Sequence, residues 1–153
     1  MIRIKKIKWH IYPFIVITIF CFYYCGNSSD LAQIKNYKID YYTTGGVTGR
    51  SDGLTVTSEG ELKFWNGITI TNRTVTDSLK LDNNDIAKLS DLIADSTIYS
   101  FKYHKPGNLT TVLKVTSDIG SNTISFPGTI TGGSFPHKIK ELIIELNELK
   151  NKR

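Results

Sequence analysis

The sequence has few cysteines, and both of them, Cys21 and Cys25, lie near the N-terminus. The chain after Cys25 has no thiol pair to oxidise, so its folded part must be held together by a core. It also lacks a Gly-x-Ser-x-Gly elbow and any carboxylate, histidine or cysteine spacing typical of a metal site. Its two histidines, His104 and His137, are predicted to be solvated surface residues. We therefore expect no enzyme, no metal and no cofactor.

A hydrophobic run long enough to span a membrane is also missing. The longest apolar stretch runs from Ile11 to Tyr24, whereas a spanning helix needs about 20 residues. It follows a basic tip that carries Arg3, Lys5, Lys6 and Lys8. A positive tip followed by an apolar run of about 7–15 residues is typical of a secretory signal, which predicts that the protein works outside the cytoplasm.

The positive charge of the chain belongs largely to that N-terminal segment. The formal net charge is +5, and because four cations lie in the segment, the part beyond Cys25 carries +1. The Lys and Arg residues of that part are scattered among Asp and Glu, so the sequence has no basic stripe to neutralise phosphates. We expect no nucleic-acid partner.

Cys25 stands where the apolar run meets Gly26-Asn27-Ser28-Ser29, an arrangement that resembles a bacterial lipoprotein signal. The resemblance implies a signal peptide over 1–24, an acylated Cys25 that begins a flexible spacer over 25–36, and a single domain over 37–153. The residue after the cysteine is Gly26, and in this respect the signal resembles that of lipoproteins sorted to the outer membrane. In the alternative interpretation, Cys21 and Cys25 are apolar positions of an uncleaved signal anchor. Either way the chain is tethered to a membrane.

Alternation of apolar, β-branched and aromatic residues with period two begins at Tyr37. It predicts strands at 37–42, 54–57, 61–65, 68–71, 111–116 and 123–126. Asn66-Gly67 predicts a two-residue hairpin turn, because both central positions of a type I′ turn need positive φ. Ser58-Glu59-Gly60 predicts the turn before it. The candidates for the inner face of this region are Leu62, Phe64, Ile68 and Ile70, while 99–103 is either another strand or an extended lead-in.

Two helices are expected. The first is capped by Asp82, has Asp85 in its first turn and ends near Asp95-Ser96. The second begins with Ser134 as its cap and Pro136 inside the first turn. Its apolar face is Ile139, Leu142, Ile143, Leu146 and Leu149. The element order predicts an α+β fold, in which two helices pack on one face of a mostly antiparallel sheet.

The segment 45–53 is the most unusual part of the interior because it is dense in glycine. One interpretation is a wide turn in which glycines supply positive φ or close backbone approach. The other is a protruding recognition loop on a rigid sheet. A phosphate cradle would need a helix after the loop, and a strand follows instead. The candidate contact residues are Gly45, Gly46, Gly49 and Arg50.

The Gly45-Gly46-Val47-Thr48-Gly49 turn, the helix after Leu81, the strand at 111–115 and the helix at Phe135-Pro136 together resemble the emfourin-like family. That family includes inhibitors of thermolysin-like metalloproteases. The resemblance implies a sheet covered by helices and a secreted or envelope metallopeptidase as partner. We expect a lipid-anchored, non-enzymatic envelope protein with a macromolecule-binding domain. The alternative is a structural or host-facing surface lipoprotein with no inhibitory role.

Overall fold

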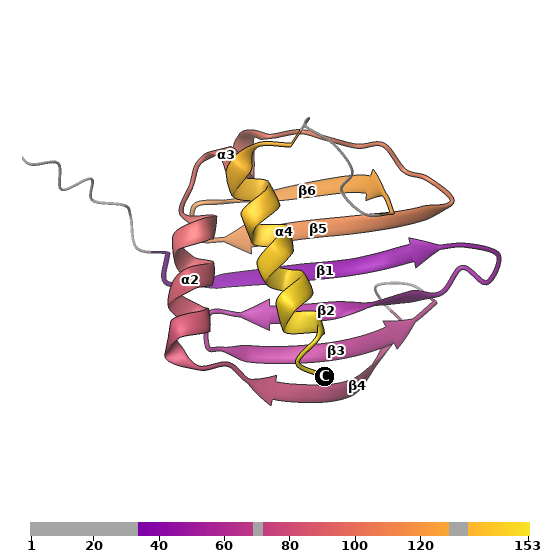
Figure 1. Cartoon of the computed structure of the whole chain (residues 1–153), viewed down its shortest axis with the longest axis horizontal. Helices are drawn as coiled ribbons and strands as arrows, with labels where there is room; N and C mark the ends of the chain where they lie inside the picture. Colours follow the sequence, from indigo (N-terminus) through magenta and orange to yellow (C-terminus); the bar gives the residue numbers. More distant parts are fainter. Residues whose placement is uncertain (1–33, 69–71, 129–134) are drawn as a thin grey trace, which may run out of the picture. The chain divides into compact units, whose positions relative to one another are not determined.

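The computed structural model describes residues 34–68, 72–128 and 135–153, and within them six strands form one antiparallel sheet (Figure 1). The strands lie in the order β4-β3-β2-β1-β5-β6, so the first strand of the chain is central. Their bounds are β1 Tyr37–Gly45, β2 Ser51–Thr57, β3 Glu61–Gly67, β4 Arg73–Lys80, β5 Leu109–Ser117 and β6 Gly120–Pro127. The predicted α+β fold with a mostly antiparallel sheet is confirmed.

Among the described residues, helices cover one face of this sheet and none lies on the other face (Figure 1). The helices are α2 Asn83–Ile93, the four-residue α3 Thr97–Ser100, and α4 His137–Lys150. The core lies between them and the sheet, and on the strand side it includes Ile39, Leu54 and Leu113. All five apolar residues predicted for the last helix are buried in α4. The spacing of those residues along α4 is therefore explained by burial against the sheet.

The first predicted helix is found with the predicted cap. The side chain of Asp82 accepts a hydrogen bond from the backbone N–H of Asp85 at 2.8 Å, which satisfies one of the unpaired donors at the helix start. The helix ends at Ile93 with Ala94 as its C-cap, slightly before the predicted end. The next residues form α3 and then an extended lead-in, which joins the sheet through a bridge between His104 and Ser125.

The start of the last helix differs from the prediction. Pro136 has φ −55° and ψ 149° and is the residue before the helix rather than part of its first turn. An extended ψ at Pro136 cannot continue a helix, so the helical hydrogen bonds begin with the N–H of Lys140 donating to the Pro136 carbonyl at 3.1 Å. Ser134, the predicted cap, lies outside the described residues.

The two turns predicted in the first half of the sheet have different outcomes. Gly60 has φ +77° and its N–H donates to the Thr57 carbonyl at 2.9 Å, which confirms the β2–β3 turn. The turn at Asn66-Gly67 is wrong, because neither residue has positive φ and β3 continues through both. They stay extended because Asn66 pairs with Asp52 and Gly67 with Ser51 across β2.

The strand predicted at 68–71 is also wrong where it can be assessed. Ile68 follows the end of β3 and is 66% exposed, so it does not face the core, and 69–71 lie outside the described residues. On the side away from β2, the partner of β3 is β4, which was not predicted. Its apolar pattern is weak because it is an exposed edge strand, and its register with β3 shifts at Phe64/Trp65. The hairpin of β5 and β6 is found as predicted.

Candidate interaction surfaces

The four predicted contact residues lie in the loop that joins β1 to β2. Gly45, Gly46 and Gly49 have φ of +112°, +73° and +60°, and the Gly49 N–H donates to the Gly46 carbonyl at 3.2 Å. The loop is fastened to the chain before β5, because the Gly46 N–H donates to the Asn108 carbonyl at 2.7 Å. A Cβ on Gly45 would lie 2.2 Å from that same oxygen, so only glycine fits there. The segment is therefore a glycine turn that projects from the sheet (Figure 1), and its use for recognition stays a prediction.

Arg50 lies at the edge of a groove beside this loop. The groove has a volume of about 420 Å³ and is lined by the first residues of β2, the last residues of β3 and one residue of each adjoining connection: Arg50, Ser51, Asp52, Asn66, Gly67 and Ile68. Asp52 forms an ion pair with Lys150 at 2.9 Å, which links the groove to the end of α4. The fold thus places the predicted loop next to a concave, polar surface.

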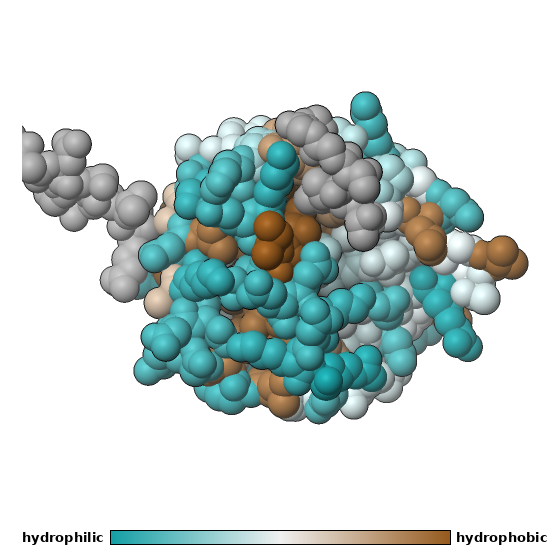
Figure 2. All heavy atoms as spheres, in the orientation of Figure 1, coloured by the Kyte–Doolittle hydropathy of each residue, from teal (hydrophilic) through white to brown (hydrophobic). Residues whose placement is uncertain are grey.

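Three exposed aliphatic side chains lie at this end of the sheet, two on connections and one at the start of β5. Val47 is fully exposed, and Ile68 and Leu109 are more than half exposed. Brown atoms at the right-hand edge of Figure 2 mark apolar residues at this end. Leu109 neighbours Gly46, and Ile68 lines the groove with Arg50. We define the loop end as Gly45–Arg50 together with Ile68 and Leu109. Sequence reasoning missed these aliphatic residues, although an apolar residue directly after two glycines in a turn is a usable signal.

The sheet face opposite the helices contains a buried polar cluster around Asp40. The Asp40 carboxylate accepts from the Thr55 hydroxyl at 2.6 Å and from the Arg73 guanidinium at 3.2 Å, and Lys38 lies 3.4 Å away. The Trp65 indole N–H donates to the Thr55 hydroxyl oxygen at 3.1 Å. These groups satisfy one another, so the cluster explains how a carboxylate can be buried there.

Two aromatic residues complete the cluster. The Arg73 guanidinium lies 5.1 Å from the centre of the Trp65 ring, within cation–π distance, and the Tyr42 ring lies 5.4 Å from it. Burial, and then the negative charge of Asp40, raise the pKa of Tyr42. Between the rings, a Cβ on Gly53 would lie 2.3 Å from the Cβ of Tyr42. The glycine allows the aromatic side chains to pack across β2.

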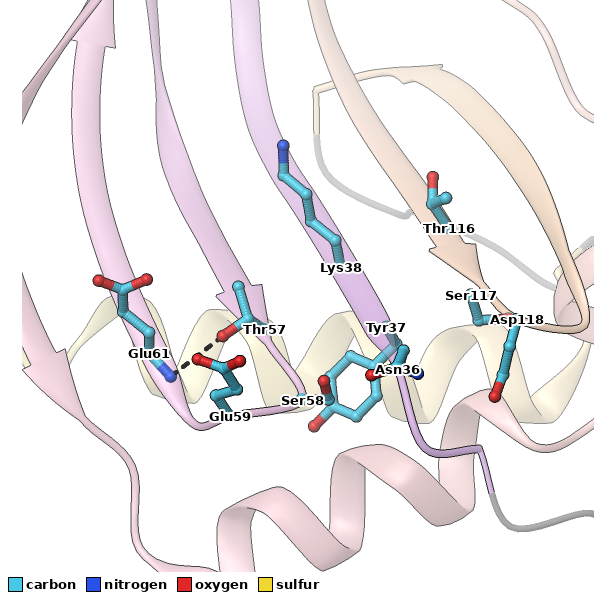
Figure 3. A pocket seen from close by; sticks show the side chains of 10 residues that line it. All are labelled: Asn36, Tyr37, Lys38, Thr57, Ser58, Glu59, Glu61, Thr116, Ser117 and Asp118. Carbon is cyan, nitrogen blue, oxygen red and sulfur yellow. Dashed lines mark hydrogen bonds between the residues drawn. The ribbon is translucent and has the colours of Figure 1, made fainter.

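We call the side of the sheet without a helix the open face. Register and alternation place on it Lys38, Asp40 and Tyr42 of β1, Thr55 of β2, Lys63 and Trp65 of β3, Arg73 and Lys80 of β4, and Lys114 of β5. Figure 3 looks at the end of this face where β1 begins, with α2 and α4 behind the sheet. A shallow hollow of about 500 Å³ lies here, and Lys38, Glu61 and Thr116 are among the residues that line it.

Tyr37 lines the same hollow, but its hydroxyl group does not point into it. Its ring turns toward α2 (Figure 3), and its buried hydroxyl lies toward Ser90 without a well-formed hydrogen bond. Burial raises the pKa of Tyr37. The hollow therefore presents the charged and hydroxyl groups of the strands rather than this phenol.

The two histidines occupy different environments. His137 begins α4 and is exposed, with Glu141 at 3.3 Å, which fits its predicted place at the surface. His104 is also exposed, but its Nδ1 contacts the Ser125 hydroxyl, a partner that the sequence did not reveal. Among the described residues, no three His, Cys, Asp or Glu side chains are placed to hold one metal ion.

Cys25, the predicted acylation site, lies outside the described residues. Within residues 34–68, 72–128 and 135–153, no helix combines the length and the apolar character needed to cross a membrane. Comparison with known family models and with curated proteins finds no match to this chain.

Proposed function

We propose that this chain is a lipid-anchored, non-enzymatic protein of the cell envelope whose folded domain binds another macromolecule through the loop end. The observation that carries the proposal is the set of exposed aliphatic side chains at one end of the sheet: Val47 and Ile68 on connections, and Leu109 at the start of β5. Exposed apolar groups clustered on loops of a rigid scaffold are typical of protein–protein contact sites. The hydrogen bond from Gly46 to Asn108 limits the ordering that such a loop must undergo on binding.

We take a secreted or envelope metallopeptidase as the partner class to test first. A convex loop with an apolar tip at Val47 and a cation at Arg50 has a shape that can enter the cleft of a peptidase. The resemblance to emfourin-like inhibitors points to the same class. The tether proposed for this protein is an acylated Cys25, and outer-membrane attachment is the expected location.

The experiment measures inhibition of a panel of secreted and envelope metallopeptidases by the full chain and three variants. Val47→Asp places a charge at the apolar tip and should weaken inhibition by roughly tenfold or more. Ile119→Asp is the matched control, because Ile119 is also an exposed aliphatic residue on a hairpin turn but lies at the opposite end of the sheet. Arg50→Ala tests the cation beside the groove.

A panel with no inhibited peptidase would remove the inhibitory role. Equal loss in Val47→Asp and Ile119→Asp would show that the loop end is not the contact. The alternative, a structural or host-facing surface lipoprotein, predicts that the domain is cleaved by protease added to intact cells while inhibition is absent. Mass spectrometry of the mature N-terminus tests acylation of Cys25 separately.

A further inference from the structure

Lysines that are scattered in the sequence converge on one end of the open face. Register places Lys63, Thr55, Asp40 and Lys114 in one row across the sheet, and Lys80, Glu61 and Lys38 in the row next to it. These two rows lie at the end where β1 begins. Two further carboxylates, Glu59 and Asp118, line the hollow at the same end. With Arg73, whose guanidinium reaches Asp40, the two rows themselves carry five cations against the two carboxylates Asp40 and Glu61, a formal net charge of +3, which falls to +1 when the two carboxylates of the hollow are included. We call the seven charged residues of the rows, Arg73 included, the basic end of the open face.

The ammonium groups of this surface are accessible to a partner. The side chains of Lys38 and Lys63 are 47% and 41% exposed, and Lys80 and Lys114 are exposed as well. Lys38 lies beside Asp40, and Lys63 beside Glu61 at 2.8 Å. Surface pairs of this kind are weak in water, so their cations can also interact with a second negative surface.

The helical side of the domain has the opposite balance. The helices and their flanking residues, 82–100 and 137–153, contain six cations and seven carboxylates, a formal net charge of −1. Several of those cations are committed to local pairs, such as Lys88 with the buried Glu145, and Lys152 with Asp85. A negatively charged plane would therefore attract the open face and repel the helical side, which orients the domain.

The chain itself supplies a reason why that plane is a bilayer. Lys38 is the second residue of β1, so the basic end lies where the chain emerges from the N-terminal spacer. If Cys25 is acylated, Tyr37 lies twelve positions after the anchor, and a fully extended chain of that length reaches at most about 40 Å. The tether keeps the domain at high local concentration beside the membrane. The attraction of Lys and Arg to anionic headgroups acts within about one Debye length, roughly 8–10 Å, of the surface.

We propose that the basic end of the open face docks on the anionic phospholipid headgroups of the same bilayer that holds the N-terminal anchor, leaving the loop end free for a partner. This inference rests on the membrane tether of the proposed function. Under this inference, one end of the sheet binds the membrane and the other end binds the partner. Lys38, Lys63 and Lys114 contact phosphate oxygens, and residues 45–50 and 109 point away from the headgroups.

The test is lysine acetylation by a water-soluble reagent, read by mass spectrometry, on the full-length processed protein in vesicles. One set of vesicles contains phosphatidylcholine alone, and the other contains about one third phosphatidylglycerol. We expect Lys38, Lys63 and Lys114 to react roughly threefold or more slowly on the anionic vesicles, and Lys138 and Lys140 of α4 to be unchanged. Added salt at about 1 M should remove the difference.

Charge-reversal variants sharpen the result. Lys63→Glu with Lys114→Glu should abolish the protection of Lys38, whereas Lys138→Glu with Lys140→Glu makes the same change in net charge on α4 and should preserve it. Equal reactivity on both vesicle types, with the protein bound to the vesicles at high salt, would overturn the docking inference and leave the tether intact. Release of the protein from both vesicle types at high salt would overturn the tether, and the docking inference with it. Inhibition of a peptidase by the same preparation is a separate readout that neither outcome changes.

Discussion

On the side covered by α2 and α4, the strands bury aliphatic and aromatic side chains such as Ile39, Leu54 and Leu113, and all three are inaccessible to solvent. On the open face the strands also bury residues, but these are Asp40, Thr55 and Trp65, which are joined by hydrogen bonds and an ion pair. The covered face removes apolar area from water, which is the larger stabilising effect. The open face protects its strands with its own long side chains, because the Arg73 guanidinium and the Tyr42 ring both lie beside the Trp65 ring. A sheet with helices on one side only thus needs other side chains to cover its second side. We call the cover formed here by Asp40, Tyr42, Thr55, Trp65 and Arg73 the polar lid.

The largest effect is expected on the covered face. Leu142→Ala removes a fully buried side chain from α4 and leaves a cavity against the sheet, so the free energy of unfolding should fall by about 2–5 kcal/mol. Urea denaturation followed by circular dichroism measures the change. The exposed Ile144→Ala on the same helix is the control and should have little effect. A loss below about 1 kcal/mol for Leu142→Ala would mean that the helices contribute less than this comparison assigns to them.

On the open face, Gly53→Ala tests the close packing across β2. The new methyl group would lie 2.3 Å from the Tyr42 Cβ and 2.4 Å from the Tyr41 carbonyl oxygen, so the two strands must move apart. We expect a loss of about 1–3 kcal/mol, measured in the same urea experiment. A change in the near-ultraviolet signal of Trp65 should accompany it, because the ring contact with Tyr42 would be disturbed. Unchanged stability and spectrum would show that the aromatic side chains are not packed as described.

A smaller effect is expected for Arg73→Met, which removes the cation but keeps part of the apolar stem. Asp40 retains Thr55 and Lys38, and Arg73 is partly exposed, so the loss should be about 1–2 kcal/mol. Combining it with Asp40→Asn removes the unbalanced buried charge and should restore part of the stability. A double variant less stable than the sum of the two single losses would contradict this account of the lid.

The smallest effect concerns two adjacent tyrosines on opposite faces. Burial raises the pKa of Tyr41, which donates to Asn147 of α4, while burial and then Asp40 raise the pKa of Tyr42. A raised folded pKa means that the folded state holds the proton more tightly. This stabilising contribution is therefore present below the unfolded pKa near 10 and is lost as the pH rises beyond it. Asp40→Asn should lower the pKa of Tyr42 and leave that of Tyr41 unchanged, as followed by tyrosinate absorbance with Tyr41→Phe and Tyr42→Phe for assignment. A parallel shift of both groups would mean that the two faces are not electrostatically separate.

The elements that could be predicted from the sequence are those with a clearly buried side. Burial gives a clear period to the apolar residues of some elements, as at Ile139 and Leu142 in α4 and at Leu113 in β5. For this reason α4, β1, β5 and β6 could be predicted. Strand β4 could not, because it lies at an exposed edge and its alternation is broken where its register shifts. Asn66-Gly67 was misleading because its local turn preference is overridden by pairing with β2.

For the candidate surfaces, the glycine loop could be identified from composition, and its four residues do lie together. The exposure of Ile68 could not be predicted, because an isoleucine after a strand pattern favours the core. Convergence of Lys38, Lys63 and Lys114 was implicit in alternation, since each is next to a buried residue of its strand. Recognising it required the register between strands, which one sequence without pairing information does not supply.

The shift in register between β3 and β4 also affects the exposed edge of the sheet. Within the described residues β4 has only β3 as a sheet neighbour, so its outer backbone groups could template pairing with another chain. The irregularity beside Phe64 and the charges of Asp77 and Lys80 interrupt the flat, uniform edge that such pairing requires. An edge with these features is a poor template for pairing with a second copy of the chain.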